Sequence, residues 1–200
     1  PLALSRGNGM YRRLCNDTLI FKKNSLQSCC RLIENNQKEK PFLVWANRCV
    51  EGKTEQIKTD FSGYVHKLSY WLTSIACFGL WEEDCQGIEA DTAGAELSLW
   101  QVRKELEVAS RKDNVLICNE RLTETQNVAK KNISYGIFKV FYENYFELLK
   151  PYFENERLSC KEKEFLEKDL LFRFLYFWCA QWELQNRTLE YNRSENLKEA

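Results

Sequence analysis

Aromatic residues crowd into about a quarter of this chain, from Ser134 to Trp182, and this crowding constrains the fold more than any other feature. The segment holds fifteen of the 27 aromatic residues. Burying one large apolar side chain is worth roughly 1.5–3 kcal/mol, and two helices alone cannot hide so many rings. We therefore expect the rest of the chain to fold against this segment. The fifteen are Tyr135, Phe138, Phe141, Tyr142, Tyr145, Phe146, Tyr152, Phe153, Phe165, Phe172, Phe174, Tyr176, Phe177, Trp178 and Trp182.

The spacing of apolar residues in this segment predicts a helical hairpin. We expect Pro151 to break or kink the first arm. Ser159 and Glu162 form the pattern of a capping box, which marks the start of the second arm. The predicted inward faces are Ile137, Phe138, Phe141, Tyr145, Leu148 and Leu149 in the first arm, and Phe165, Leu166, Leu170, Phe174, Phe177 and Trp178 in the second.

Two amphipathic helices are expected before the hairpin. Asp60 is a good N-cap, and the apolar residues in 61–76 recur at helical spacing. Gly79 fits a C-cap for that helix. Another apolar stripe in 95–109 predicts a second helix.

Shorter segments are less decisive. The apolar run 42–46 fits either a short strand or the start of a helix, and periodicity does not separate the two. The run 115–118 suggests an extended piece. Thr123 with Gln126 fits a capping box for a further helical turn.

The scarcity of helix breakers sets the expected fold class. The chain has three prolines and eight glycines, fewer than a sandwich or barrel needs for its turns. We expect an all-α fold, an irregular bundle of five or six helices with long connectors, braced by disulfides. The expected single helical domain is 1–182, with a Cys-rich irregular or helical segment 1–50 and a main helical core 60–182, followed by a polar tail 183–200.

The number of cysteines, nine, and the number of Asn-x-Ser/Thr sequons, four, together favour a secreted, disulfide-bonded glycoprotein. Four Asn-x-Ser/Thr sequons are candidate glycosylation sites: Asn16, Asn132, Asn186 and Asn192. The alternative is a cytosolic protein whose thiols pack as small apolar groups. Which cysteines pair, and which one is left over, stays open. The disulfide candidates are Cys15, Cys29, Cys30, Cys49, Cys77, Cys85, Cys118, Cys160 and Cys179.

Charge and hydropathy exclude two classes of partner. Lysine plus arginine equals aspartate plus glutamate at 29 each, so the chain has no electrostatic footprint for nucleic acid. The most apolar run, Leu170–Ala180, is interrupted by Arg173 and is too short for a membrane span. The chain opens at Pro1 without an initiator methionine, so we expect a processed piece of a longer protein.

Catalytic patterns are sparse. The only histidine, His66, is at best half of a Cys–His pair, and we expect it to lie on a helix surface. Neither a G-x-S-x-G elbow, a phosphate-binding glycine loop nor a C-x-x-C pair occurs. The acidic run 82–84 is expected to be solvated. We therefore predict no catalytic residues, no cofactor and no metal site.

Two segments resemble neprilysin-like zinc metallopeptidases. ADTAGAELSLW, residues 90–100, resembles the family's E-N-x-A-D-x-x-G-L-x-x-A-Y around the third zinc ligand. LLFRFLYFWCA, residues 170–180, is similar to Q-L-F-F-L-x-F-A-Q-x-W-C, a helix that ends in a disulfide-bonded cysteine, here Cys179. A rival register of the first motif places it at 125–130, followed by 136–142.

The departures from this family concern its zinc site. The family's H-E-x-x-H motif needs two histidines, and this chain has one. The third ligand, a glutamate, corresponds to Gly87 in the first register and to Gln126 in the second, where Lys130 replaces the family's aspartate. The resemblance thus implies the C-terminal part of a degenerate, secreted relative without zinc or hydrolysis.

From these patterns we expect a secreted, non-catalytic helical domain that binds a protein or peptide partner, and the resemblance implies an inactive peptidase-like scaffold for it. The alternative is the C-terminal fragment of a secreted zinc metallopeptidase whose catalytic motif lies outside this chain. A helical cytokine-like ligand is a third class, disfavoured by the Cys-dense first half. The sequence names neither the partner nor the oligomeric state.

Overall fold

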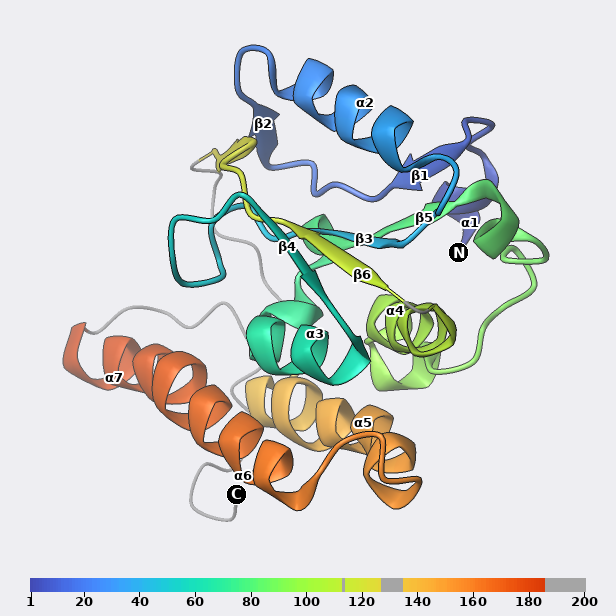
Figure 1. Cartoon of the computed structure of the whole chain (residues 1–200). Helices are drawn as coiled ribbons and strands as arrows, with labels where there is room; N and C mark the ends of the chain where they lie inside the picture. Colours follow the sequence, from blue (N-terminus) through green and yellow to red (C-terminus); the bar gives the residue numbers. More distant parts are fainter. Residues whose placement is uncertain (113, 127–134, 186–200) are drawn as a thin grey trace.

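The computed structural model describes residues 1–112, 114–126 and 135–185, with side chains up to residue 180 (Figure 1). Of the described residues, 53% are helical and 14% lie in strands. The α-helices are α1 (Leu2–Ser5), α2 (Ser25–Asn36), α3 (Phe61–Leu68), α4 (Trp100–Arg111), α5 (Tyr145–Glu154), α6 (Cys160–Asp169) and α7 (Tyr176–Gln185). The strands are β1 (Tyr11–Arg13), β2 (Leu19–Phe21), β3 (Phe42–Trp45), β4 (Gln56–Thr59), β5 (Gly79–Trp81), β6 (Val115–Cys118) and β7 (Thr123–Thr125).

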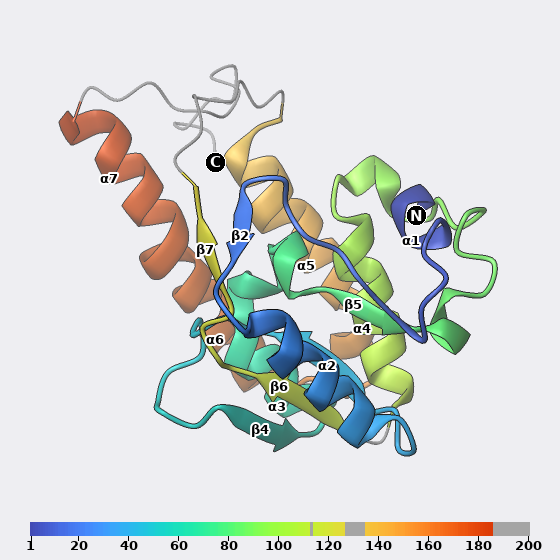
Figure 2. The same ribbon diagram turned by 90° about the horizontal axis from the view of Figure 1, so that it is seen from above.

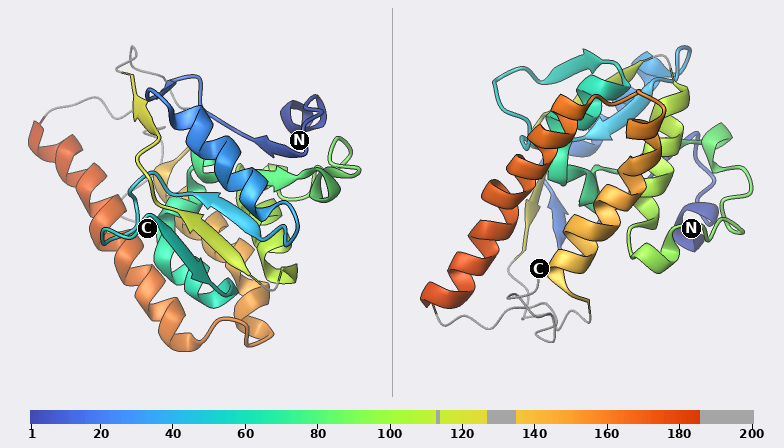
Figure 3. Two further views of the ribbon diagram at one scale, coloured as in Figure 1. Left: turned by 45° about the horizontal axis from the view of Figure 1, so that its top comes forward. Right: turned by 90° about the horizontal axis from the view of Figure 1, so that it is seen from below.

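Short helical turns join these elements. The 3-10 turns are η1 (Ser69–Thr73), η2 (Ile75–Cys77), η3 (Glu82–Cys85) and η4 (Ala95–Leu97), and the π-helical turns are η5 (Lys139–Asn144) and η6 (Leu170–Leu175). Through η6, α6 and α7 form one long helical arm, which diverges from α5 toward the C-terminal end of α7 (Figure 3).

A three-stranded sheet lies at the centre, in the order β3-β6-β4. β3 and β6 run parallel, with Val44 opposite Ile117, although more than seventy residues separate them in the chain. β4 pairs antiparallel with β6. Two small antiparallel ribbons, β1-β5 and β2-β7, lie beside it (Figure 2).

Both faces of the sheet are covered, and alternate residues of β3 and β6 enter two different cores. Leu43 and Trp45 pack with α2, whereas Phe42 and Val44 join the larger cluster beneath the sheet. Figure 1 shows α2 on one side and α3 and α4 on the other. A strand that is buried on both faces has apolar residues at every position. This explains why the sequence of 42–46 does not alternate between apolar and polar residues.

The expected all-α fold is therefore wrong, because the centre of the molecule is a sheet sandwiched by helices. The aromatic hairpin is an outer layer over α3 and α4 (Figure 3), and its inward residues, such as Tyr145, Leu149 and Leu166, join the larger core cluster without forming its centre. Among the largest fully buried side chains of the described residues, Tyr145 alone comes from the hairpin. The rings at the centre belong to the sheet and its flanks, as Trp45, Trp81 and Tyr64 show.

The predicted face of the second arm is confirmed at Leu166 and Leu170, which are buried, and is wrong farther along the arm. There Leu175 points inward, while Phe177 is 53% exposed. The cause is η6, since the wider π-helical turn breaks the spacing of 3.6 residues on which the prediction rested.

Disulfide bracing is a second correction. The described part of the chain holds no disulfide, and the thiols of Cys15, Cys29, Cys30, Cys49, Cys77, Cys85, Cys118 and Cys160 are free. Cys29, Cys77, Cys85 and Cys118 are buried and pack with apolar neighbours. These four thiols behave as small hydrophobic groups, the role that the alternative interpretation gave them.

Some of the predicted helix caps and boundaries are confirmed and others are wrong. The Asp60 cap is confirmed, because its carboxylate accepts a hydrogen bond from the Gly63 amide at 2.8 Å. The Ser159–Glu162 capping box is confirmed as well. The helix predicted over 61–76 ends at Leu68, Gly79 begins β5 instead of capping a helix, and the capping box predicted at Thr123 lies in β7.

Two further expectations concern the ends of the chain and the membrane. In the polar tail 183–200, residues 186–200 lie outside the described residues. None of the helices in the described ranges combines the length and the apolar character that crossing a bilayer requires.

Candidate functional site

Two pockets lie side by side around the segment that follows α3. The larger has a volume of about 720 Å³ and the smaller about 340 Å³. Trp71 and Arg173 line both pockets, so they form the wall between them. A volume of several hundred Å³ is typical of sites that hold a small ligand or a few side chains of a partner.

The chain reaches this wall through an abrupt turn at Ser69. Its φ of 47° and ψ of −127° end α3 and redirect the backbone into η1. The residues before the turn, His66 to Ser69, line the smaller pocket. After it, Tyr70, Trp71, Thr73, Ser74 and Ile75 line the larger one, with Trp71 in both. The turn therefore distributes neighbouring residues between the two pockets.

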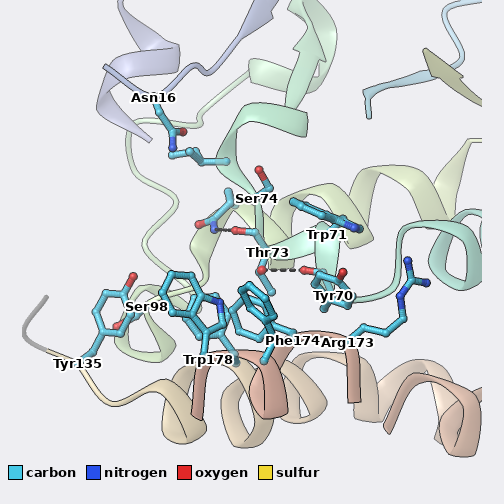
Figure 4. Close-up of a pocket in the computed structure, with 14 residues that line it drawn as sticks. Asn16, Tyr70, Trp71, Thr73, Ser74, Ser98, Tyr135, Arg173, Phe174 and Trp178 are labelled. Carbon is cyan, nitrogen blue, oxygen red and sulfur yellow. Dashed lines mark hydrogen bonds between the residues drawn. The ribbon is translucent and has the colours of Figure 1, made fainter. Parts of the chain in front are cut away.

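One side of the larger pocket is a continuous layer of aromatic rings. Phe174 is at its centre, 5.4 Å from Tyr70 and 4.9 Å from Phe141 between ring centroids. Trp178 meets Phe174 edge-on at 6.3 Å, and Trp71 continues the layer from Tyr70 at 5.2 Å. Figure 4 shows Phe174 and Trp178 on the α6–α7 arm and Tyr70 and Trp71 on η1 around the same space.

The rest of the lining carries neutral polar groups, which belong to Thr73, Ser74, Ser98, Gln101 and Asn16. The Gln101 amide donates to the Thr73 carbonyl at 3.4 Å, and the Thr73 hydroxyl donates to the Tyr70 carbonyl at 2.7 Å. The lining of the larger pocket thus combines aromatic rings with hydroxyl and amide groups.

Arg173 supplies the only formal charge among the residues that line the larger pocket. Its guanidinium lies 3.2 Å from the Asp169 carboxylate and 3.4 Å from the Glu51 carboxylate. In Figure 4 the guanidinium points away from the rings. Because two carboxylates already neutralise Arg173, the ring-lined space favours an uncharged group.

The smaller pocket is polar and holds the only histidine of the sequence. The His66 ring stacks on Phe165 with centroids 4.0 Å apart. Lys67, Ser69 and Cys49 also line this pocket. The Ser69 side chain is buried, and its hydroxyl has no hydrogen-bond partner in the described structure.

A Cys–His nucleophile is not supported by this arrangement, although Cys49 and His66 line the same pocket. Burial raises the pKa of the Cys49 thiol to about 11. A nucleophilic cysteine needs the opposite, a pKa lowered by a nearby positive charge. Cys49 therefore stays a neutral thiol at physiological pH.

The acidic run 82–84 is tied to lysines. Glu83 accepts from Lys40 at 2.5 Å and from Lys112 at 3.1 Å, and Asp84 lies 3.2 Å from Lys112. Hydrogen bonds from Lys40 and Lys112 lower the pKa of Glu83. Across the described ranges, no three or more His, Cys, Asp or Glu side chains gather as metal ligands.

Of the four sequons, the structure places one. Asn16 is exposed between β1 and β2 and lines the larger pocket (Figure 4). Asn132, Asn186 and Asn192 lie outside the described residues.

Known proteins give no further guide. No protein-family model, curated protein or solved structure matches this chain. The resemblance to neprilysin-like peptidases stays a prediction. Its first segment carries Asp91, which pairs with Arg103 and with Lys104 at 3.5 Å, and its second segment, 170–180, is helical. Residues 127–130 of the rival register lie outside the described residues.

Sequence reasoning missed most of the residues that line the two pockets. Tyr70, Thr73 and Gln101 carry no motif, and Trp71 was assigned to the buried face of a helix. One signal was available: Arg173 interrupts the most apolar run of the chain, and this charge lies at the wall between the pockets.

Proposed function

We propose that this chain is a non-catalytic binding domain that holds an aromatic or other large apolar side chain of a protein or peptide partner in the larger pocket. The observation that carries this proposal is the aromatic layer centred on Phe174, which lines a cavity of about 720 Å³ among the described residues. Preformed concave sites lined by rings, with a few polar groups opposite, are typical of ligand sites.

The chemistry of the lining supports binding over catalysis. Rings gain from stacking or edge contact with another ring, about 0.5–1.5 kcal/mol beyond the area that they bury. The hydroxyl and amide groups of Thr73, Ser98 and Gln101 can pair with the backbone of a bound peptide. Neither Cys49, with its raised pKa, nor His66, stacked on Phe165, has the setting of a nucleophile or general base.

An extracellular or lumenal location remains part of this proposal, supported by the exposed sequon at Asn16.

Calorimetry with a capped five-residue peptide tests the proposal. The peptide has a central phenylalanine flanked by glutamines, and its control has alanine at the centre. We expect binding of the phenylalanine peptide and none of the alanine peptide. Equal heats from both peptides would refute an aromatic pocket.

Two exposed phenylalanines of the same helical arm give a matched pair of variants. Phe177 is 53% exposed and lines the pocket, while Phe172 is 71% exposed and does not line it. Phe177→Ala should weaken binding several-fold, and Phe172→Ala should leave it unchanged. Because both side chains are mostly exposed, neither change should disturb folding. A loss of affinity in Phe172→Ala alone would place the site elsewhere.

A further inference from the structure

The smaller pocket adjoins the larger one, because the two share lining residues. Trp71 and Arg173 belong to both linings, and Ser69 and Tyr70 are consecutive residues on opposite sides of the wall. An aromatic side chain held against Phe174 and Trp71 leaves its neighbour in the peptide near the smaller pocket.

Among the side chains of the smaller pocket that lack an ion pair or a hydrogen bond in the described structure, most are hydrogen-bond donors. Lys67 and His66 are exposed at its rim, and no ion pair within the described structure involves Lys67. The Ser69 hydroxyl is buried, with the residue 4% exposed, and lacks a partner among the described residues. Cys49 is a neutral thiol and contributes no charge.

Two carboxylates also face this pocket, and they differ in how firmly they are held. The Asp169 side chain is 7% exposed and is paired with Arg173 one helical turn away, so these two charges cancel. The Glu51 side chain is 85% exposed and reaches Arg173 from the solvent side, 3.4 Å away. Its position shows that a carboxylate arriving from solvent can contact Arg173, and an exposed pair of this kind is weak enough to be exchanged.

The backbone of Ser69 adds an independent sign of function. A φ of 47° is unfavourable for a residue with a Cβ, and such strain clusters at binding sites, where the surrounding structure enforces it. Here the strain keeps a buried hydroxyl without a partner at the wall between two cavities.

We propose that the smaller pocket is a subsite for a carboxylate, the acidic side chain next to the aromatic residue of a bound peptide. The carboxylate displaces Glu51 from Arg173 and accepts from Lys67 and from the Ser69 hydroxyl. Charge-assisted hydrogen bonds of this kind are about twice as strong as neutral ones, and they select glutamate or aspartate over their amides. This inference rests on the proposed aromatic pocket, because it extends the same ligand.

A pair of capped peptides tests the subsite. Both have a central phenylalanine, flanked by glutamates in one and by glutamines in the other, so that only the side-chain carboxylates differ. In calorimetry we expect the glutamate peptide to bind about tenfold more tightly, which corresponds to one good charge-assisted contact. Equal affinities would overturn the subsite and leave the aromatic pocket standing. Failure of both peptides to bind would overturn both proposals.

Three variants identify the groups involved. Lys67→Gln and Ser69→Ala should each reduce the preference for glutamate over glutamine, while Glu51→Gln should increase it by removing the competing carboxylate. Lys161→Gln, a change of an exposed lysine on α6 that lines neither pocket, is the control and should leave the preference unchanged. An unchanged preference in Lys67→Gln and Glu51→Gln would contradict the proposed contacts.

Discussion

The Tyr145 hydroxyl donates a hydrogen bond of 2.9 Å to the Ser69 carbonyl, joining residues 76 positions apart in the chain. Tyr145 is fully buried in α5, so this bond anchors the turn after α3 to the outer helical layer. It holds Ser69 in a conformation that residues with a Cβ rarely adopt, and the placement of both pockets depends on that turn.

Ser69→Gly should stabilise the protein. Its φ of 47° and ψ of −127° match the first central position of a type II′ turn, where glycine is favoured. Relief of the strain and loss of an unpaired buried hydroxyl should together contribute about 1 kcal/mol. We expect a rise in Tm of about 2–4 °C by calorimetry. Ser69→Ala, which keeps the Cβ, should show a smaller rise, and a lower Tm in Ser69→Gly would contradict the account of the turn.

Glu105 should make stability depend on pH. The residue is 1% exposed, and neither carboxylate oxygen has a hydrogen bond of ordinary geometry. Burial raises the pKa of Glu105 well above its usual value, although the neighbouring Tyr64 hydroxyl acts in the opposite direction. Folded Glu105 therefore binds a proton that the unfolded chain releases above about pH 4.3.

The sign of this effect is fixed by that proton. Below the pKa that Glu105 has in the unfolded chain, the residue is protonated in both the folded and the unfolded state, so its burial costs no ionisation energy. As pH rises toward the folded pKa, the free energy of unfolding falls by up to about 1.4 kcal/mol per pH unit. Glu105→Gln removes this contribution. In urea unfolding, the free energy of unfolding of the variant should therefore rise relative to that of the wild type between pH 5 and 7. A difference that is constant with pH would mean that Glu105 is not protonated in the folded state.

Gly79→Ala should destabilise the β1-β5 ribbon. A Cβ at Gly79 would overlap the Tyr11 ring. The Tyr11 hydroxyl donates to the Leu43 carbonyl at 3.1 Å and accepts from the Trp45 indole at 3.0 Å, so it cannot move without losing both bonds. Overpacking of this kind costs about 1–3 kcal/mol in denaturant unfolding. In a Tyr11→Leu background the same change should cost less, and additive effects would exclude the clash as its cause.

A glycan at Asn16 should weaken binding at the larger pocket. Asn16 lines that pocket, and a glycan is bulky. Thr18→Ala destroys the sequon but keeps Asn16. When both proteins are made in secreting cells, the variant should bind the phenylalanine peptide at least several-fold more tightly, and mass spectrometry should show the glycan on the wild type alone. Equal affinities despite a glycan at Asn16 would show that the pocket opens away from it.

Two of the capping signals were predictable from sequence because they depend on neighbouring residues, whereas the cap expected at Gly79 and the capping box expected at Thr123 lie in strands. Asp60 and Ser159 each satisfy amide groups within one turn, and both act as expected. The apolar stripe of 95–109 also gave a helix, with Val102 and Leu106 buried. In these patterns the interactions that form the structure are made by residues close together in the sequence.

The sheet was not predictable in the same way. β3 and β6 are four residues each, and their pairing joins Val44 to Ile117 across the whole α3–α4 segment. Nothing local specifies a partner at that distance, and strands covered on both faces lack alternation. The candidate site was missed for a related reason, since the Ser69 turn and η6 both break the helical period on which the expected faces depended.

Indole N–H signals in the ¹H–¹⁵N spectrum test the central claim most directly, because Trp71 and Trp178 line the larger pocket whereas Trp45 and Trp81 are buried in the sheet core. With signals assigned by single Trp→Phe changes, the phenylalanine peptide should shift those of Trp71 and Trp178 and leave those of Trp45 and Trp81 in place. Binding that leaves both Trp71 and Trp178 unshifted would contradict the account.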